Sequence, residues 1–364
     1  MTSLFDPIQL GAIGAKNRII MAPLTRGRSE GVHVPITALK AEYYAQRAGA
    51  GLIIAEATGI TQEGSGWPSA PGIWLPEHVE AWKPVTDAVR EAGGKIVLQL
   101  WHMGRLVHPD FLGGAAPVSS SATTAPGFAH VPGEKKPYEQ ARALRLDEIP
   151  RVIGDYAHAA KNAMAAGFDG VQLHGANGYL IDQFLRDNSN FRDDDYGGPI
   201  ENRIRLLREV TQALADTVGA DRTSVRLSPN GETQGADDSN PVPLFTAAAA
   251  ALQEIGIGFL ELREQKTYGT FGTSEVPRIS PDIRKVFKAP LILNQEYTLE
   301  TARADLESGL ADAISFGRKF ISNPDLPERL ASGAELTPDN FRTWYSPGPE
   351  GYTDYPKLGA LVDA

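Results

Sequence analysis

The sequence predicts an α/β protein that folds as a single (β/α)8 barrel, the TIM barrel. Eight short aliphatic runs alternate strictly with longer amphipathic segments. The length of 364 residues suits one barrel with insertions. The first run, RIIMAPL, lacks the G-x-G-x-x-G that typically follows the first strand of a doubly wound open sheet. We therefore expect residues 1–364 to form one barrel domain.

The predicted strands are short and rich in Ile, Val and Leu. Their alternation with helices implies parallel strands joined by right-handed crossovers, and eight such units close without leaving an edge. In chain order the runs are RIIMAPL, GLIIAEATG, KIVLQLW, GVQLHG, TSVRLSP, GFLELR, PLILNQ and DAISFGR.

The predicted helices carry apolar residues at spacings of three and four. The most apolar window, LFTAAAAALQEIGIGFLEL, contains Gln253, Glu254 and two glycines, so it indicates a helix turning into a strand and not a membrane span. The other helical segments are residues 35–49, 76–94, 147–168, 199–219 and 298–310.

Three stretches interrupt the alternation. Residues 2–18 carry the turn signals Gly11 and Gly14 and predict a hairpin across the bottom of the barrel. Residues 102–145 form a long loop after the third strand, and residues 264–281 form another after the sixth. Both loops emerge at the carboxyl ends of the strands, where barrel active sites lie. Within the second, Tyr268 and Phe271 are candidates to close over a substrate.

Composition narrows the possible functions. The excess of 45 acidic over 35 basic residues gives a net charge of -10, which argues against nucleic acid as a partner. The absence of cysteine excludes disulfides, thiolate metal sites and cysteine nucleophiles. The N-terminus does not resemble a signal peptide, so we expect a cytoplasmic protein that does not associate with membranes.

Mostly neutral hydrogen-bonding residues gather at the predicted strand ends. No lysine, H-x-H pair or carboxylate cluster occurs there, which disfavours Schiff-base and metal-dependent chemistry, and no metal site is expected. The set suits a flat, heteroatom-rich cofactor with a phosphate tail. Its members are Thr25, Ala57, Gln99, Trp101, His174, Arg226, Asn294, Gly317 and Arg318.

Several of these residues also admit purely structural interpretations. His174 and Asn177 could be a buried histidine and a helix N-cap, with Tyr179 as a core aromatic. Arg226 should point into the barrel, because Val225 and Leu227 flank it, and there it could pair with Glu56 or Glu261. Trp101 could simply pack the barrel, and Gly-Arg pairs such as that in ISFGRKF are common on surfaces.

The motifs together resemble the old yellow enzymes, the FMN-dependent ene-reductases. The resemblance runs from Leu4 to about the last ten residues, with the motifs in the expected order. It is carried by FDPIQLGAIGAKNRIIMAPLTRGR, YYAQRAGAGLIIAEATGI, QLWHMGR, VQLHGANGYLIDQFL, RDDDYGGPIENRIRLL, VRLSPNG, FGRKFISNPDL and GYTDYP.

The resemblance implies non-covalently bound FMN. Pro23, Leu24 and Thr25 match positions against the flavin ring, and Ala57 and Gln99 match contacts to its pyrimidine edge. Arg226 matches the arginine near flavin N1, and Gly317 and Arg318 match the phosphate grip. Asn294 joins the predicted cofactor contacts, whereas Glu296 would oppose a phosphate unless it turned away.

The resemblance also implies a reaction. His174 and Asn177 would donate hydrogen bonds to the oxygen of an α,β-unsaturated carbonyl or nitro compound, hydride would pass from flavin N5 to the β-carbon, and Tyr179 would protonate the α-carbon. NADPH or NADH would reduce the flavin in a ping-pong cycle. Asn177 occupies a position where relatives carry His or Asn, so substrate preference does not carry over. Trp67, Trp101 and Tyr352 match substrate-pocket positions.

Two alternatives from other classes stay open. One is a nitroester or quinone reductase on the same scaffold. The other is a catalytically idle barrel that binds flavin or phenols. For the ene-reductase we expect a monomer or homodimer whose partners are electron-poor alkenes and a nicotinamide cofactor.

Overall fold

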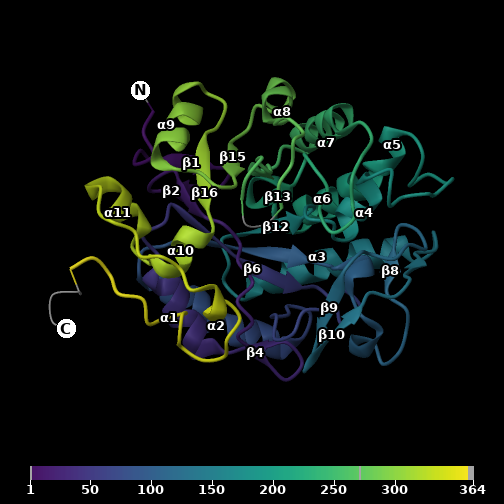
Figure 1. Ribbon diagram of the computed structural model, residues 1–364, viewed down its shortest axis with the longest axis horizontal. Coiled ribbons are helices and arrows are strands. Elements are labelled where there is room, and N and C mark those ends of the chain that lie inside the picture. Colours follow the sequence, from purple (N-terminus) through teal and green to yellow (C-terminus); the bar gives the residue numbers. More distant parts are fainter. Residues whose placement is uncertain (1, 270–271, 360–364) are drawn as a thin grey trace.

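Eight parallel strands close into a barrel in the computed structural model, which describes residues 2–269 and 272–359. Figure 1 shows these strands at the centre of the molecule with helices around them. Each strand falls within one of the predicted runs, so the predicted (β/α)8 barrel is confirmed. The barrel strands are β3 (Ile19–Met21), β6 (Leu52–Gly59), β7 (Ile96–Trp101), β12 (Gly170–His174), β13 (Thr223–Leu227), β14 (Phe259–Arg263), β15 (Leu291–Asn294) and β16 (Ala313–Phe316).

Every predicted helical segment contains a helix, with residues 199–219 divided into two consecutive helices at Ile204. Four further short helices, Leu180–Leu185, Ser280–Val286, Arg318–Ser322 and Leu326–Ser332, lie outside the predicted segments. Leu173 of β12 and Leu207 of α6 are among the buried residues of the main core, which lies between strands and helices. The helices are α1 (Thr37–Gln46), α2 (Pro76–Glu91), α3 (Ile149–Ala165), α4 (Leu180–Leu185), α5 (Ile200–Arg203), α6 (Arg205–Val218), α7 (Pro241–Ile255), α8 (Ser280–Val286), α9 (Leu299–Glu307), α10 (Arg318–Ser322) and α11 (Leu326–Ser332).

Alternation along each strand separates the core from the barrel interior. On β13, Val225 and Leu227 belong to the main core between strands and helices, so Arg226 between them points inward. On β12, Leu173 belongs to the same core, which turns Gln172 and His174 inward. The same parity explains why polar side chains line the upper barrel although every barrel strand is buried.

A hairpin seals the amino-terminal end of the barrel, as predicted. It consists of β1 (Ile8–Leu10) and β2 (Ile13–Ala15), which pair antiparallel. Leu10 and Ile13 from the hairpin pack with inward residues at the lower ends of the barrel strands. This separate apolar cluster comprises Leu10, Ile13, Ala15, Ile20, Leu52, Ile54, Val97, Phe259, Ile292 and Ala313.

The long segment after β7 contains secondary structure that was expected to be loop. A hairpin forms from β9 (Phe128–Val131) and β10 (Glu134–Pro137), and β8 (Val118–Ser119) pairs in parallel with β11 (Arg142–Ala143). A further antiparallel pair, β4 (Ser29–Glu30) and β5 (Val34–Pro35), follows β3. These additions lie on the segments that leave the carboxyl ends of the strands.

Within residues 2–269 and 272–359, none of the helices has the length and apolar character needed to cross a bilayer. Most of α7 falls within the most apolar window of the sequence, and this helix leads into β14 as predicted.

Candidate active site

A cavity of about 780 Å³ opens at the carboxyl ends of the barrel strands. It brings together residues that the sequence singled out and that lie far apart in the chain. The predicted site residues that line it are Pro23, Leu24, Thr25, Ala57, Trp67, Gln99, Trp101, His174, Asn177, Tyr179, Arg226, Asn294, Gly317 and Arg318.

Tyr352 is the predicted site residue that does not line this cavity, so its expected role in shaping the substrate pocket is not met. Its ring is fully buried and stacks on Tyr43, with ring centroids 4.0 Å apart and planes 6° from parallel. The guanidinium carbon of Arg28 lies 4.4 Å from the centre of the Tyr352 ring. Attraction between buried guanidinium groups and the aromatic face explains why the ring turns inward. Trp344 and Tyr345 from the same C-terminal segment reach the cavity instead.

His174, Asn177 and Tyr179 converge because β12 ends in a tight turn. His174 is the last residue of β12, and Asn177 adopts a left-handed backbone conformation with φ 61°, which asparagine tolerates well. Tyr179 then precedes α4. The rings of His174 and Tyr179 lie 4.8 Å apart at 80°. Since Tyr179 occupies the N-cap position of α4 and no side chain caps that helix, the interpretation of Asn177 as an N-cap is wrong.

His174 is held as a neutral hydrogen-bond donor. The backbone N–H of Ala176 donates to its Nδ1 at 3.4 Å, so Nδ1 acts as an acceptor and the ring proton lies on Nε2. Burial, followed by the positive charges of Arg226 and Arg263, lowers the pKa of His174 well below its ordinary value. At neutral pH the ring therefore offers one N–H and carries no charge.

Tyr179 keeps its proton over the physiological range. The pKa of the Tyr179 hydroxyl lies far above its ordinary value, mainly because the hydroxyl is buried. Its ring meets Trp101 edge to face at 5.0 Å between centroids. Trp101 thus both lines the cavity and fixes the orientation of the phenol, so packing and site functions coexist in this residue.

A network of buried polar groups forms the floor of the cavity. Arg226 pairs with Glu261 and donates from Nη2 to Oδ1 of Asn294 at 2.8 Å. Glu261 also accepts hydrogen bonds from Ser315 at 2.6 Å and from Gln172 at 3.0 Å. The ion pair of Arg226 that was considered from the sequence is therefore present, and its partner is Glu261. Arg226 also lines the cavity.

This floor fits the polar edge of a flavin. Within the described part of the chain, Nε of Arg226 is buried and has no hydrogen-bond partner, although it borders the cavity. A buried donor of this kind calls for an acceptor from a ligand. The amide of Gln99 donates to Gln172 at 2.8 Å, which leaves its oxygen as the group available to a ligand N–H. Alternating donors and acceptors are what a flavin pyrimidine ring requires.

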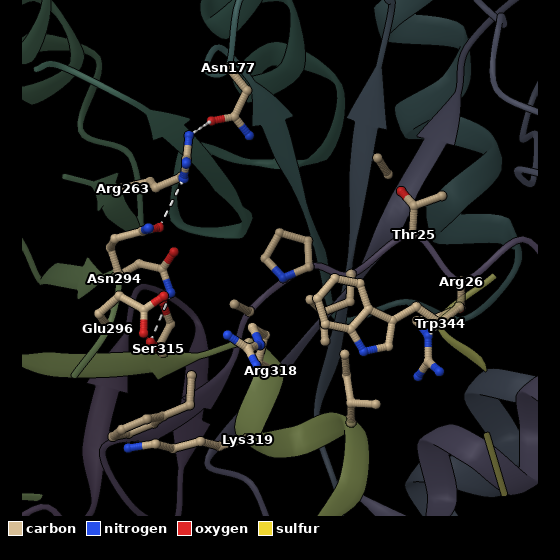
Figure 2. Close-up of a pocket in the computed structure, with 18 of the residues that line it drawn as sticks. Thr25, Arg26, Asn177, Arg263, Asn294, Glu296, Ser315, Arg318, Lys319 and Trp344 are labelled. Carbon is tan, nitrogen blue, oxygen red and sulfur yellow. Dashed lines mark hydrogen bonds between the residues drawn. The ribbon is translucent and has the colours of Figure 1, made fainter. Parts of the chain in front are cut away.

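Another part of the cavity holds two cationic side chains, Arg318 and Lys319, together with the carboxylates of Glu296 and Asp339. Arg318 pairs with Asp339 at 3.0 Å and stacks over Trp344, while Nζ of Lys319 donates to the backbone oxygen of Tyr297 at 2.6 Å. Figure 2 shows Arg318, Lys319 and Glu296 around the same space. Burial lowers the pKa of Lys319, whereas the negative charge of Glu296 raises it. Glu296 therefore does not turn away from the cavity, and its negative charge lies near the Lys319 ammonium group.

The lining residues that the sequence analysis did not identify include Gln234, Arg263, Lys319, Trp344 and Tyr345. A signal existed for Arg263, because it follows the inward Glu261 by two residues on β14 and so shares its face. Trp344 and Tyr345 lie in an irregular segment, where no periodicity indicates direction.

The loop after β14 is described only in part. Tyr268 is 58% exposed and does not line the cavity, while Phe271 lies outside the described residues. The suggestion that the two close over a substrate stays a prediction.

Comparison with known proteins places the whole chain beside a set of flavin enzymes. The profile of the NADH:flavin oxidoreductase / NADH oxidase family matches residues 3–337. The chain is 39% identical to 12-oxophytodienoate reductase 2 of Arabidopsis thaliana, over 98% of this chain and 96% of that protein. It is 44% identical to a chanoclavine-I aldehyde reductase of Penicillium roqueforti, over 98% and 96% respectively.

Solved structures show the same similarity in three dimensions. The old yellow enzyme homologue from Zymomonas mobilis superposes with a TM-score of 0.96 and 62% identity, covering 97% of this chain and 99% of that one. Morphinone reductase in complex with tetrahydroNAD superposes with a TM-score of 0.93 and 42% identity, covering all of both chains.

Proposed function

Because the chain belongs to the NADH:flavin oxidoreductase / NADH oxidase family, we propose that it reduces activated carbon–carbon double bonds at the expense of a reduced nicotinamide. Family membership confirms the resemblance to the old yellow enzymes. The chain is an oxidoreductase, its cofactor is FMN, and the tetrahydroNAD complex of morphinone reductase supports a nicotinamide as its partner. The proposed substrates are α,β-unsaturated carbonyl and nitro compounds.

The convergence of His174, Asn177 and Tyr179 on one cavity supports this proposal most strongly. When bound, FMN supplies the two-electron chemistry that no side chain offers, since a flavin can take up a hydride and give it to a second molecule. The residues proposed to hold it are Pro23, Leu24, Thr25, Ala57, Gln99, Arg226, Asn294, Gly317 and Arg318.

His174 and Asn177 are proposed to bind the substrate oxygen. The donors are the Nε2–H of the neutral imidazole and an amide N–H of Asn177. The substrate oxygen that accepts from them would gain negative charge as the conjugated double bond is reduced. Donors fixed in advance stabilise that charge without reorganising. A neutral histidine suits this role. A charged histidine would also bind anions tightly before the reaction, and only binding that is stronger in the transition state than in the ground state raises the rate.

Tyr179 is proposed to donate the proton that completes the reduction. Its hydroxyl stays protonated at neutral pH and its ring lies against both Trp101 and His174. Gln234, whose amide donates to the backbone oxygen of Asn177 at 2.8 Å, acts against the effect of burial and lowers the pKa of Tyr179. Because its pKa is raised, the phenolate left after proton transfer takes up a proton again at neutral pH.

One cavity must serve both the nicotinamide and the alkene. Since His174, Asn177 and Tyr179 line the same cavity as the residues proposed to hold FMN, the two ligands are proposed to bind there in turn. A ping-pong rate law follows from this geometry.

The test is an absorption spectrum of the purified protein, followed by anaerobic addition of NADPH and then 2-cyclohexenone. We expect a flavin spectrum that NADPH bleaches and that the enone restores. A protein that retains no FMN would refute the cofactor assignment. A protein that is bleached but reoxidised only by a nitrate ester or a quinone would instead support the alternative reductase.

A further inference from the structure

The backbone of Asn177 is fixed on both sides of its Cα. Its N–H donates to the hydroxyl of Ser228 at 2.8 Å, and its carbonyl oxygen accepts from Nε2 of Gln234 at 2.8 Å. Its φ of 61° places it in the left-handed region. The backbone leaves one important freedom, which is the direction of the side-chain amide.

Arg263 removes that freedom. Its Nη1 lies 2.8 Å from Oδ1 of Asn177. A guanidinium group has donors only, so the amide must present its oxygen to Arg263 and turn its nitrogen away. Figure 2 shows the amide in this orientation, with the oxygen directed at Arg263 and the nitrogen pointing elsewhere. No hydrogen bond from Nδ2 of Asn177 is found to the parts of the chain that the structure describes.

Arg263 is itself held firmly. It ends β14, where it pairs in register with Asn294, and its side chain is buried with 6% of the residue exposed. Its Nε donates to Oε1 of Gln295 at 3.0 Å. Burial, followed by the charge of Arg226, lowers the pKa of Arg263 to about 10, so the group remains charged at neutral pH. A charged donor forms a stronger hydrogen bond with an amide oxygen than a neutral one does.

We propose that Arg263 is a positioning residue that locks the carboxamide of Asn177 with its NH2 group directed at the substrate oxygen. This inference rests on the proposed function, because it assigns to Asn177 the donor role described above. Without Arg263, the amide could rotate by half a turn and offer an oxygen to the substrate oxygen, which would repel it.

Two other roles for Arg263 must be separated from this one. It could act directly on the substrate through its charge, independently of Asn177. It could also serve only to stabilise the fold. A double-mutant cycle distinguishes the first, since residues that act through each other have non-additive effects. If the variant that lacks Arg263 retains FMN and melts at the wild-type temperature, a role in stabilising the fold alone is ruled out.

The experiment compares the holoenzymes of wild type, Arg263→Met, Asn177→Ala and the double variant. The measured quantity is the second-order rate constant for reoxidation of the reduced flavin by 2-cyclohexenone. We expect losses of about tenfold for Arg263→Met and about a hundredfold for Asn177→Ala. The double variant should lose about a hundredfold, because Arg263 has no amide left to orient. A loss of about a thousandfold in the double variant, which is the product of the two single losses, would overturn the inference.

Two further variants keep the test decisive. Arg329→Met deletes another buried arginine, on α11 and outside the cavity lining, and should leave the reoxidation rate within about twofold. Arg263→Lys retains a charged donor and should recover part of the rate. Should Arg263→Met lose FMN or fail to fold, the same cycle is run with Arg263→Lys, and additive effects there would equally overturn the inference.

The outcomes separate the inference from the function on which it rests. If 2-cyclohexenone does not reoxidise the reduced wild type, the proposed function fails. If the wild type is reoxidised and the two variants act additively, only the role of Arg263 fails.

Discussion

The two ends of the barrel interior are filled by opposite kinds of side chain. At the amino-terminal end, Leu10 and Ile13 of the hairpin close over an apolar layer that includes Ile20 and Leu52. At the carboxyl end, Arg226, Glu261 and their neighbours form a buried polar network. Both layers come from the same alternation along the same strands. The difference shows that the lower layer stabilises the barrel, whereas the upper layer keeps donors and charges that only a ligand can satisfy fully.

The largest expected effect is at the upper layer. Tyr179→Phe should slow reoxidation by 2-cyclohexenone about a thousandfold, because it removes the proton donor. Reduction of the flavin by NADPH and the melting temperature should stay close to those of wild type. Stopped-flow absorbance measures each half-reaction separately.

The matched control is Tyr156→Phe on α3, which likewise deletes the hydroxyl of a buried tyrosine but lies outside the cavity lining. That variant should turn over at the wild-type rate. If Tyr179→Phe were reoxidised as fast as the control, the proton would come from elsewhere.

The next effect belongs to the lower layer. Leu52→Ala should reduce the free energy of unfolding by about 3 kcal/mol, since it leaves a cavity under the hairpin. Chemical denaturation at a fixed FMN concentration measures this loss. The rate of reoxidation per bound flavin should not change. A large fall in that rate would mean that the two layers are mechanically coupled.

A smaller effect concerns pH. His174 has a lowered pKa, so the folded protein binds its proton less readily than the unfolded chain does. Stability from this group is therefore lost as pH falls below the ordinary histidine pKa of about 6.5. Between pH 6.5 and 5.5, His174→Asn should lose about 1 kcal/mol less unfolding free energy than wild type. Equal losses in the two proteins would show that His174 titrates normally.

The smallest effect tests the placement of Tyr352. Since its hydroxyl is buried away from the cavity, Tyr352→Phe should change KM and kcat by less than about twofold and stability by less than about 0.5 kcal/mol. Steady-state kinetics with 2-cyclohexenone gives both constants. A raised KM alone would place this tyrosine at the substrate after all.

The sequence predicted the barrel well because alternation and strand order are local properties. The parity of SVRLS identified the inward direction of Arg226, and the turn after GVQLH brought three predicted residues to one cavity. The same rule applied to FLELR would have found Arg263. Tyr352 could not be placed, because its position depends on a distant partner, Tyr43, and on two buried arginines. Irregular segments carry no period from which side-chain direction can be inferred.

The long segment after β7 marks a second limit. Its hairpin, β9 and β10, has Phe128 59% exposed and follows no strong apolar alternation, so the sequence indicated only a loop. The structure nevertheless brings His130 of this hairpin against Trp67, with ring centroids 5.1 Å apart, at the edge of the cavity. Long-range contacts, and not local propensity, determine such elements.

The central claim is that two neutral donors meet at one ligand oxygen. A crystal structure of the FMN-loaded wild type with 4-hydroxybenzaldehyde tests it most directly. We expect the phenol oxygen to lie within about 3 Å of both Nε2 of His174 and Nδ2 of Asn177, with Oδ1 of Asn177 still facing Arg263. A ligand oxygen bound away from these two nitrogens, or an Asn177 amide that is turned over, would contradict the account.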